Sequence, residues 1–164
     1  MDLEVILTGS FGVGKSSLFN RFIHGEFSDK YYGTIGVRVN EKELEFDDLK
    51  VNLKLWDTAG EVNQQKVPAN YFESKDCIVY VVDLNRPFTF KNIPYDLQYL
   101  KNNSPGCNII VLGNKLDLID EKRLEEIKTD KLGINFDWLV SAKTGENVDD
   151  VFLSIAKNHV KIPK

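Results

Sequence analysis

The sequence is poor in cysteine, in long apolar runs and in clustered basic residues, and each shortage excludes a class of protein. Cys77 begins one apolar strand-like run and Cys107 precedes another, which is typical of small buried hydrophobes and not of metal ligands or a disulfide pair. No run approaches the roughly 18 apolar residues of a membrane-spanning helix. Residues 1–4 are acidic where a secretory signal would be basic. These features predict a soluble, cytoplasmic protein.

The composition fits one compact domain. With 164 residues, of which 42% are apolar, the chain can bury a sizeable core, and a second domain has no room. The net charge of −4 is mild and the basic residues are scattered, so binding to nucleic acid is disfavoured. No internal repeat or low-complexity segment is present. We therefore expect a single domain over residues 1–164.

Strand-like and helix-like segments alternate along the chain, which predicts an α/β fold with a mostly parallel sheet. The six expected strands are Leu3–Thr8, Val37–Phe46, Val51–Trp56, Cys77–Asp83, Asn108–Leu112 and Asn135–Val140. About five helices are expected, starting near Lys15, Gln64, Phe88, Glu121 and Val148. No helix separates the second and third strands, so Asp47-Asp48 should close a hairpin that adds one antiparallel strand.

A glycine-rich loop follows the first strand. Residues Gly9–Ser16 read GSFGVGKS, which matches the phosphate-binding pattern GxxxxGKS between a strand and a helix. Glycines let successive backbone N–H groups surround phosphates, Lys15 supplies a positive charge, and the Ser16 hydroxyl can ligate Mg²⁺. A plain glycine-rich turn is the alternative. The placement predicts a nucleotide site.

Three further motifs stand at strand ends, where open sheets of this kind bind ligands. They are Trp56–Gly60 (WDTAG), Gly113–Asp117 (GNKLD) and Ser141–Lys143 (SAK). With the first loop they form an ordered set, and the chain resembles the small GTPases of the Ras superfamily over essentially all of its length. The resemblance implies a P-loop NTPase G domain that binds GTP or GDP with Mg²⁺.

Asp117 is expected to select the base, because a carboxylate accepts hydrogen bonds from N1–H and the exocyclic amine of guanine, and adenine lacks this donor pair. The resemblance implies that Asn114 ties this loop to the first one, that the Lys115 stem lies over the purine, and that the Ala142 N–H meets the guanine oxygen. The implied nucleotide-binding residues are Gly12, Val13, Gly14, Lys15, Ser16, Ser17, Phe27, Thr34, Gly60, Asn114, Lys115, Asp117, Ser141, Ala142 and Lys143. The implied Mg²⁺ residues are Ser16, Thr34 and Asp57.

The same resemblance implies a molecular switch. Thr34 would bind Mg²⁺ and the γ-phosphate, and Gly60 would approach that phosphate, so both segments lose their contacts when it leaves. Effectors, exchange factors and activating proteins would bind the segments around Thr34 and Glu61. A monomer is expected.

The catalytic positions depart from the family pattern. Lys15, Thr34 and Glu61 are the candidate catalytic residues, but the family has glutamine where this chain has Glu61. An ionised glutamate cannot donate to a phosphate and brings negative charge toward it. Phe11 replaces a small residue and would crowd an activating arginine, or else lie harmlessly over the loop. Slow hydrolysis is expected. The alternatives are a nucleotide-locked or nucleotide-free scaffold, and a P-loop kinase, which the guanine motif disfavours.

The sequence around Thr34 and Trp56 is most similar to the Rab branch, which implies a role in vesicle trafficking. Arg38, Val39 and the segment Tyr71–Lys75 depart from the Rab pattern, either through an unusual partner set or through drift. Rab proteins end in prenylated cysteines, and residues 159–164 contain none. Cycling on endomembranes is therefore expected only through a tail outside this sequence, or through another anchor or domain.

Overall fold

The computed structural model describes residues 1–30, 33–59, 68–129 and 133–161. Its strands are β1 (Asp2–Thr8), β2 (Val37–Phe46), β3 (Leu49–Thr58), β4 (Cys77–Asp83), β5 (Asn108–Asn114) and β6 (Trp138–Leu139). Its α-helices are α1 (Lys15–His24), α2 (Ile93–Asn103), α3 (Glu121–Lys128) and α4 (Val148–Lys161). Short 3₁₀ turns lie at Ala69–Tyr71, Pro87–Asn92 and Leu116–Leu118. The chain is an α/β protein, as predicted.

The strands form one six-stranded sheet in the order β2-β3-β1-β4-β5-β6. All neighbours are parallel except β2 and β3, whose antiparallel hairpin was predicted from the sequence. Asp47 and Asp48 close it with φ angles of 49° and 61°. Two consecutive residues with positive φ make a type I′ turn, whose twist matches that of the flanking strands. The β2 strand stands at one end of the strand order and is therefore an edge of the sheet.

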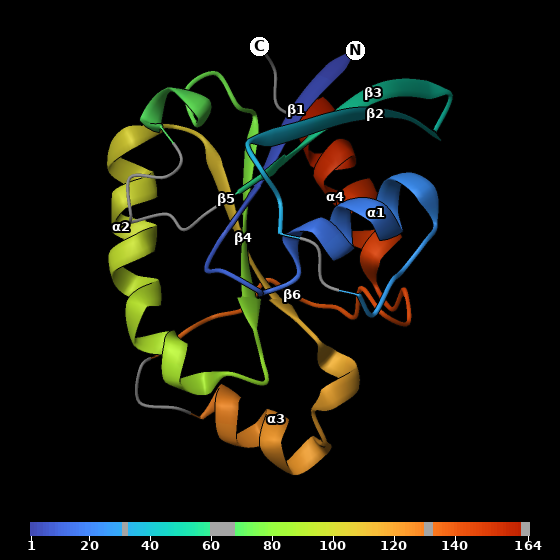
Figure 1. The fold of residues 1–164 in the computed structure, drawn as a ribbon. Helices are drawn as coiled ribbons and strands as arrows, with labels where there is room; N and C mark the ends of the chain where they lie inside the picture. The colour runs from blue at the N-terminus through green and yellow to red at the C-terminus, as the bar shows by residue number, and fades with distance from the viewer. Residues whose placement is uncertain (31–32, 60–67, 130–132, 162–164) are drawn as a thin grey trace.

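Helices cover both faces of the sheet, with α1 and α4 on one side and α2 on the other (Figure 1). Alternate β1 residues divide between these faces, since Val5 and Leu7 join the core beneath α1 and α4 while Ile6 joins the core beneath α2. On the first face Phe22 of α1 stacks on Phe152 of α4, with ring centroids 4.0 Å apart. The two buried layers fix the carboxyl ends of the parallel strands at one edge of the sheet.

Two predicted elements differ from the structure. The expected strand over residues 135–140 contains only Trp138–Leu139 in ladder conformation. Before it, the Asp137 carboxylate accepts a hydrogen bond from the Val111 N–H, so a side chain replaces a backbone ladder contact. The helix expected near Phe88 begins as a 3₁₀ turn and becomes α-helical at Ile93, next to Pro94 in its first turn. The helix expected near Gln64 lies outside the described residues.

Cys77 and Cys107 are free thiols. Cys77 is buried in the sheet and Cys107 is half-buried immediately before β5. Burial, reinforced by the nearby Asp76 charge, raises the pKa of Cys107 to about 11, and burial raises the pKa of Cys77 further. Within the described ranges, none of the helices has the length and apolar character needed to cross a membrane.

Candidate functional site

A cavity of about 830 Å³ lies at the carboxyl ends of the parallel strands. Its size is that of a site for a nucleotide-sized ligand. Among the residues expected to bind nucleotide, those in its wall are Gly12, Gly14, Lys15, Ser16, Ser17, Phe27, Thr34, Asn114, Lys115, Asp117, Ala142 and Lys143. Val13, Asp57 and Ser141 are buried behind the wall. Gly60 and Glu61 lie outside the described residues.

The first loop depends on glycine at two positions. A Cβ atom on Gly9, which has a φ of 137°, would lie 2.3 Å from the Val81 carbonyl oxygen. A Cβ atom on Gly14, which has a φ of 101°, would lie 2.3 Å from the Asn114 side-chain nitrogen. The loop therefore packs directly against β4 and against the carboxyl end of β5, and no larger residue fits at either glycine.

Lys15 is the first residue of α1 and is almost completely buried. Its ammonium group donates hydrogen bonds to the carbonyl oxygens of Gly9 and Ser10, at 2.8 and 2.9 Å. The charge is thus held over the glycine-rich loop at the N-terminal end of a helix, where the helix dipole also favours an anion. This arrangement suits a phosphate group.

Asn114 connects three loops at the base of the cavity. Its side-chain amide donates to the Val13 carbonyl at 3.0 Å, which is the expected tie to the first loop, and its side-chain oxygen accepts the Ala142 N–H at 3.1 Å. The second contact differs from the sequence-based expectation, in which the Ala142 N–H is left for the ligand. Asn114 is 1% exposed, so burial requires that both ends of its amide be paired.

The two charged residues after Asn114 are placed by polar contacts. Lys115, with a left-handed φ of 69°, donates to the Gly12 carbonyl at 3.1 Å and forms a 2.7 Å ion pair with Asp83. Asp117 accepts a 2.6 Å hydrogen bond from the Ser141 hydroxyl and is exposed to the cavity. Ser141 is therefore a support for Asp117 and not a part of the wall, which the tripeptide alone did not reveal.

The three residues expected at Mg²⁺ meet at one point. The Ser16 hydroxyl lies 2.5 Å from the Thr34 hydroxyl and donates to Asp57 Oδ2 at 2.7 Å. Asp57 is fully buried, and its Oδ1 accepts no hydrogen bond from the described part of the chain. Two hydroxyls and a carboxylate with an orphaned oxygen form a hard-oxygen donor set of the type that Mg²⁺ prefers. The residues therefore fit this ion.

Arg38 was noted in the sequence only as a departure from a family pattern, yet it lies in the cavity wall. Its Nη2 and Nε atoms donate to Asp57 Oδ2 at 2.6 and 3.2 Å. The antiparallel register pairs Arg38 of β2 directly with Asp57 of β3. The sequence signal was only an arginine four residues after Thr34, because the contact depends on the pairing of two strands.

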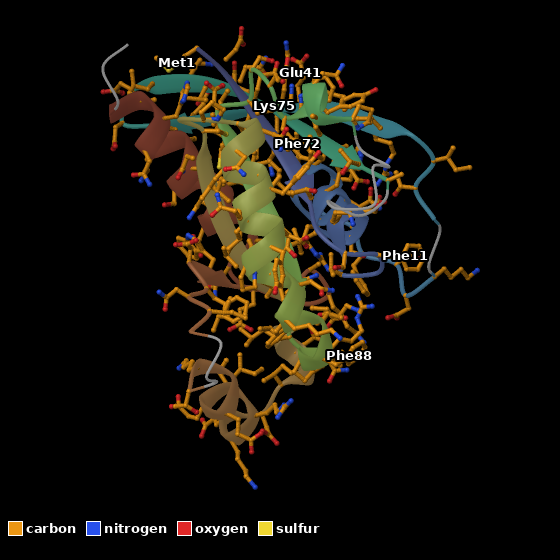
Figure 2. The ribbon with its side chains drawn as sticks, turned by 90° about the vertical axis from the view of Figure 1, so that its left-hand side faces the viewer. Met1, Phe11, Glu41, Phe72, Lys75 and Phe88 are labelled. Atoms are coloured by element: carbon orange, nitrogen blue, oxygen red, sulfur yellow. The ribbon has the colours of Figure 1, made fainter. Side chains whose placement is uncertain are left out.

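A second unpredicted contact holds the outer part of the glycine-rich loop. Arg86 pairs with the buried Asp83 at 2.9 Å and donates to the Phe11 carbonyl at 2.7 Å. The Phe11 side chain itself is 57% exposed, and Figure 2 shows it standing out from the ribbon at the margin of the molecule.

Comparisons with known proteins agree with this geometry. The family model described as "Ras family" matches residues 4–161. The chain is 36% identical over 170 residues to the Ras-related protein Rab7 of Prunus armeniaca, covering 96% of this chain and 82% of that protein. It is 37% identical over 167 residues to the Ras-related protein RABG3b of Arabidopsis thaliana, covering 94% and 82%. The Ras-related protein Rab7 of Glycine max is also 37% identical over 167 residues, with coverage of 94% and 81%.

Proposed function

The chain belongs to the Ras family as a Rab-like small GTPase, and from this membership we propose that it is a slowly hydrolysing switch in vesicle trafficking. It binds GTP or GDP with Mg²⁺ and exchanges partners according to the nucleotide. The observation that carries the proposal is the junction at Asn114, whose amide joins the phosphate loop at Val13 to the base-side loop at Ala142. One residue thereby aligns both halves of a nucleotide site.

The phosphate half supplies charge and backbone donors. Lys15, held by the carbonyls of Gly9 and Ser10, would pair with the terminal phosphates. Ser16 and Thr34 would hold Mg²⁺ through their hydroxyls, and Asp57, which accepts from the Ser16 hydroxyl, would supply a carboxylate to the same site. When bound, Mg²⁺ neutralises negative charge on the phosphates. Because Thr34 comes from the segment before β2, loss of the γ-phosphate would release that segment.

The base half supplies specificity for guanine. Asp117 is exposed to the cavity and oriented by the Ser141 hydroxyl, which leaves the carboxylate able to accept from the two neighbouring guanine donors. A bound base would cover Asp117 and remove its water contacts, so a base without the two donors would leave the carboxylate unpaired and would be rejected. Lys115 and Phe27 complete the wall on this side.

Slow hydrolysis follows from Glu61 and Phe11. Glu61 can accept a hydrogen bond from the attacking water but cannot donate to a phosphate oxygen, and it adds negative charge beside the triphosphate. The exposed Phe11 ring lies in the wall of the cavity, where an arginine from an activating protein would have to enter. Both substitutions act on the same chemical step.

The test is a change of base preference. With fluorescently labelled nucleotides, the protein should bind GDP and GTP, and a large excess of ATP should not compete. Asp117→Asn should lose GDP affinity by a factor of about 100 or more and gain affinity for xanthosine diphosphate, because an amide donates to the xanthine 2-oxygen. Asp120→Asn, on the exposed N-terminal cap of α3, is the matched control and should bind GDP normally. Equal binding of adenine and guanine nucleotides would contradict the proposal.

A further inference from the structure

We propose that Arg38 is a resident counter-cation for Asp57 that competes with Mg²⁺ and lowers the dependence of nucleotide retention on this ion. The inference rests on the proposed binding of nucleotide and Mg²⁺. It concerns a residue that the motifs do not include, because Arg38 belongs to the β2 strand and reaches the site across the sheet.

The contact between Arg38 and Asp57 satisfies a buried charge. Asp57 is 0% exposed, and an ionised carboxylate at such a position requires a compensating cation. Two nitrogens of the Arg38 guanidinium donate to its Oδ2 atom, at 2.6 and 3.2 Å. The carboxylate is thus neutralised by the protein's own side chain, and it does not need a metal ion to balance its charge.

Besides its contact with Asp57, the Arg38 guanidinium contacts two residues of α1. Its guanidinium carbon lies 4.7 Å from the centre of the Phe19 ring, and its Nη1 donates to the Asn20 side-chain oxygen at 3.4 Å. Both partners belong to α1, which also carries Ser16. Arginine suits this position because its planar group stacks on an aromatic ring while its nitrogens remain available to a carboxylate.

The guanidinium of Arg38 and the two hydroxyls expected at the metal ion meet at the same carboxylate, that of Asp57. Asp57 Oδ2 accepts from Arg38 and also from the Ser16 hydroxyl, which in turn contacts the Thr34 hydroxyl. A divalent cation at these hydroxyls would lie close to a positive charge and would find the carboxylate already neutralised. Occupancy by Arg38 and by Mg²⁺ is therefore mutually unfavourable.

The Arg38 side chain can also move away from Asp57 without leaving a cavity in the hydrophobic core. Its side chain is 42% exposed and stands on the edge strand of the sheet, so rotation into solvent is sterically open. The same edge segment carries Thr34 four residues earlier. An increase in Mg²⁺ concentration would displace Arg38 from Asp57 and, in doing so, free it on the surface beside Thr34.

The experiment measures release of a fluorescent GDP analogue at a series of free Mg²⁺ concentrations and reports the concentration that half-maximally slows release. Arg38→Gln should lower this concentration about tenfold, within the range usual for coupled binding sites. Arg38→Lys keeps the charge but loses the two-nitrogen contact, and should give a smaller shift in the same direction. If Arg38→Gln folds poorly, Arg38→Lys still tests the proposal.

Arg123→Gln is a matched control, because Arg123 is 41% exposed and forms an equally short 2.6 Å ion pair with Glu126, far from the cavity on α3. It should leave the Mg²⁺ midpoint unchanged. If the variants at position 38 bind GDP but keep the wild-type midpoint, the role of Arg38 is overturned while the proposed function stands. If the wild type binds no guanine nucleotide at all, both fail together.

Discussion

The guanidinium of Arg86 donates a 2.7 Å hydrogen bond to the backbone carbonyl of Phe11, 75 residues earlier in the sequence. The same group pairs with Asp83 at the end of β4, whose carboxylate also pairs with Lys115. Because Lys115 donates to the neighbouring Gly12 carbonyl, one buried aspartate supports two cations that both hold the glycine-rich loop. The outer part of the loop is therefore fixed by side chains outside the phosphate-binding motif.

Removing the charge of Arg86 should destabilise the protein. In Arg86→Gln, the buried Asp83 loses one of its two ion pairs with the described residues and keeps the one with Lys115. Hydrogen bonds to charged groups contribute about 1.5–3 kcal/mol. Since the Arg86 side chain is 31% exposed, we expect the free energy of unfolding to fall by about 1–2 kcal/mol. Urea denaturation at saturating GDP measures this change. Arg123→Gln should cost less than about 0.5 kcal/mol, and an equal loss in both variants would contradict the assigned role.

Restoring the family's glutamine should accelerate hydrolysis. In Glu61→Gln the side chain regains a donor and loses a negative charge beside the triphosphate, so single-turnover release of phosphate should rise by a factor of about 10 or more. Glu73→Gln makes the same chemical change outside the wall of the cavity and should have no effect. An unchanged rate in Glu61→Gln would show that another group orients the water.

Replacing Phe11 should affect stimulation more than the intrinsic rate. The ring is exposed and the Arg86 contact uses the Phe11 backbone, so Phe11→Ser should preserve the loop and leave the unstimulated rate within about threefold. In the Glu61→Gln background, it should increase stimulation by a Rab-activating domain, since an entering arginine contributes about 10³ to 10⁵ in this class of enzyme. Phe88→Ser, another exposed aromatic, is the control. Equal stimulation with and without the Phe11 ring would contradict crowding.

Cys107 should react slowly with alkylating agents until the solution is strongly alkaline. Its pKa is raised from 9.0 to about 11, chiefly by burial, so its thiolate fraction at pH 8 is about 100-fold below that of an ordinary thiol. Burial favours the neutral form, so the stability that it contributes is fully present below pH 9.0 and is lost as pH rises through about 11.

Mass spectrometry after timed treatment with iodoacetamide measures this reactivity. Cys107→Ser isolates the contribution of Cys77, which is more deeply buried and should remain unmodified in the folded protein. Protein unfolded in guanidinium should react at both sites. Rapid modification of Cys107 at pH 8 in the folded state would show that its thiol is more accessible than the structure indicates.

The sequence by itself determined the features that depend on local spacing. The glycine-rich loop follows from residues a few positions apart, and Gly9 and Gly14 have the backbone conformations that their residue type predicts. The β2–β3 hairpin follows from two strand-like runs joined by Asp47-Asp48. The alternation of strand-like and helix-like segments was sufficient to predict the α/β class and the mostly parallel sheet, because the periodicities of strands and helices are themselves local.

Only the tertiary structure decided which distant side chains meet. The short β6 strand depends on Asp137 taking the N–H of Val111, a contact that no periodicity encodes. The pairing of Arg38 with Asp57 depends on strand register, and a shift of one residue would turn Arg38 to the other face. Arg38 and Arg86 lie outside the recognised motifs, and their places beside the candidate site are set by the packing of strands and loops far apart in the chain.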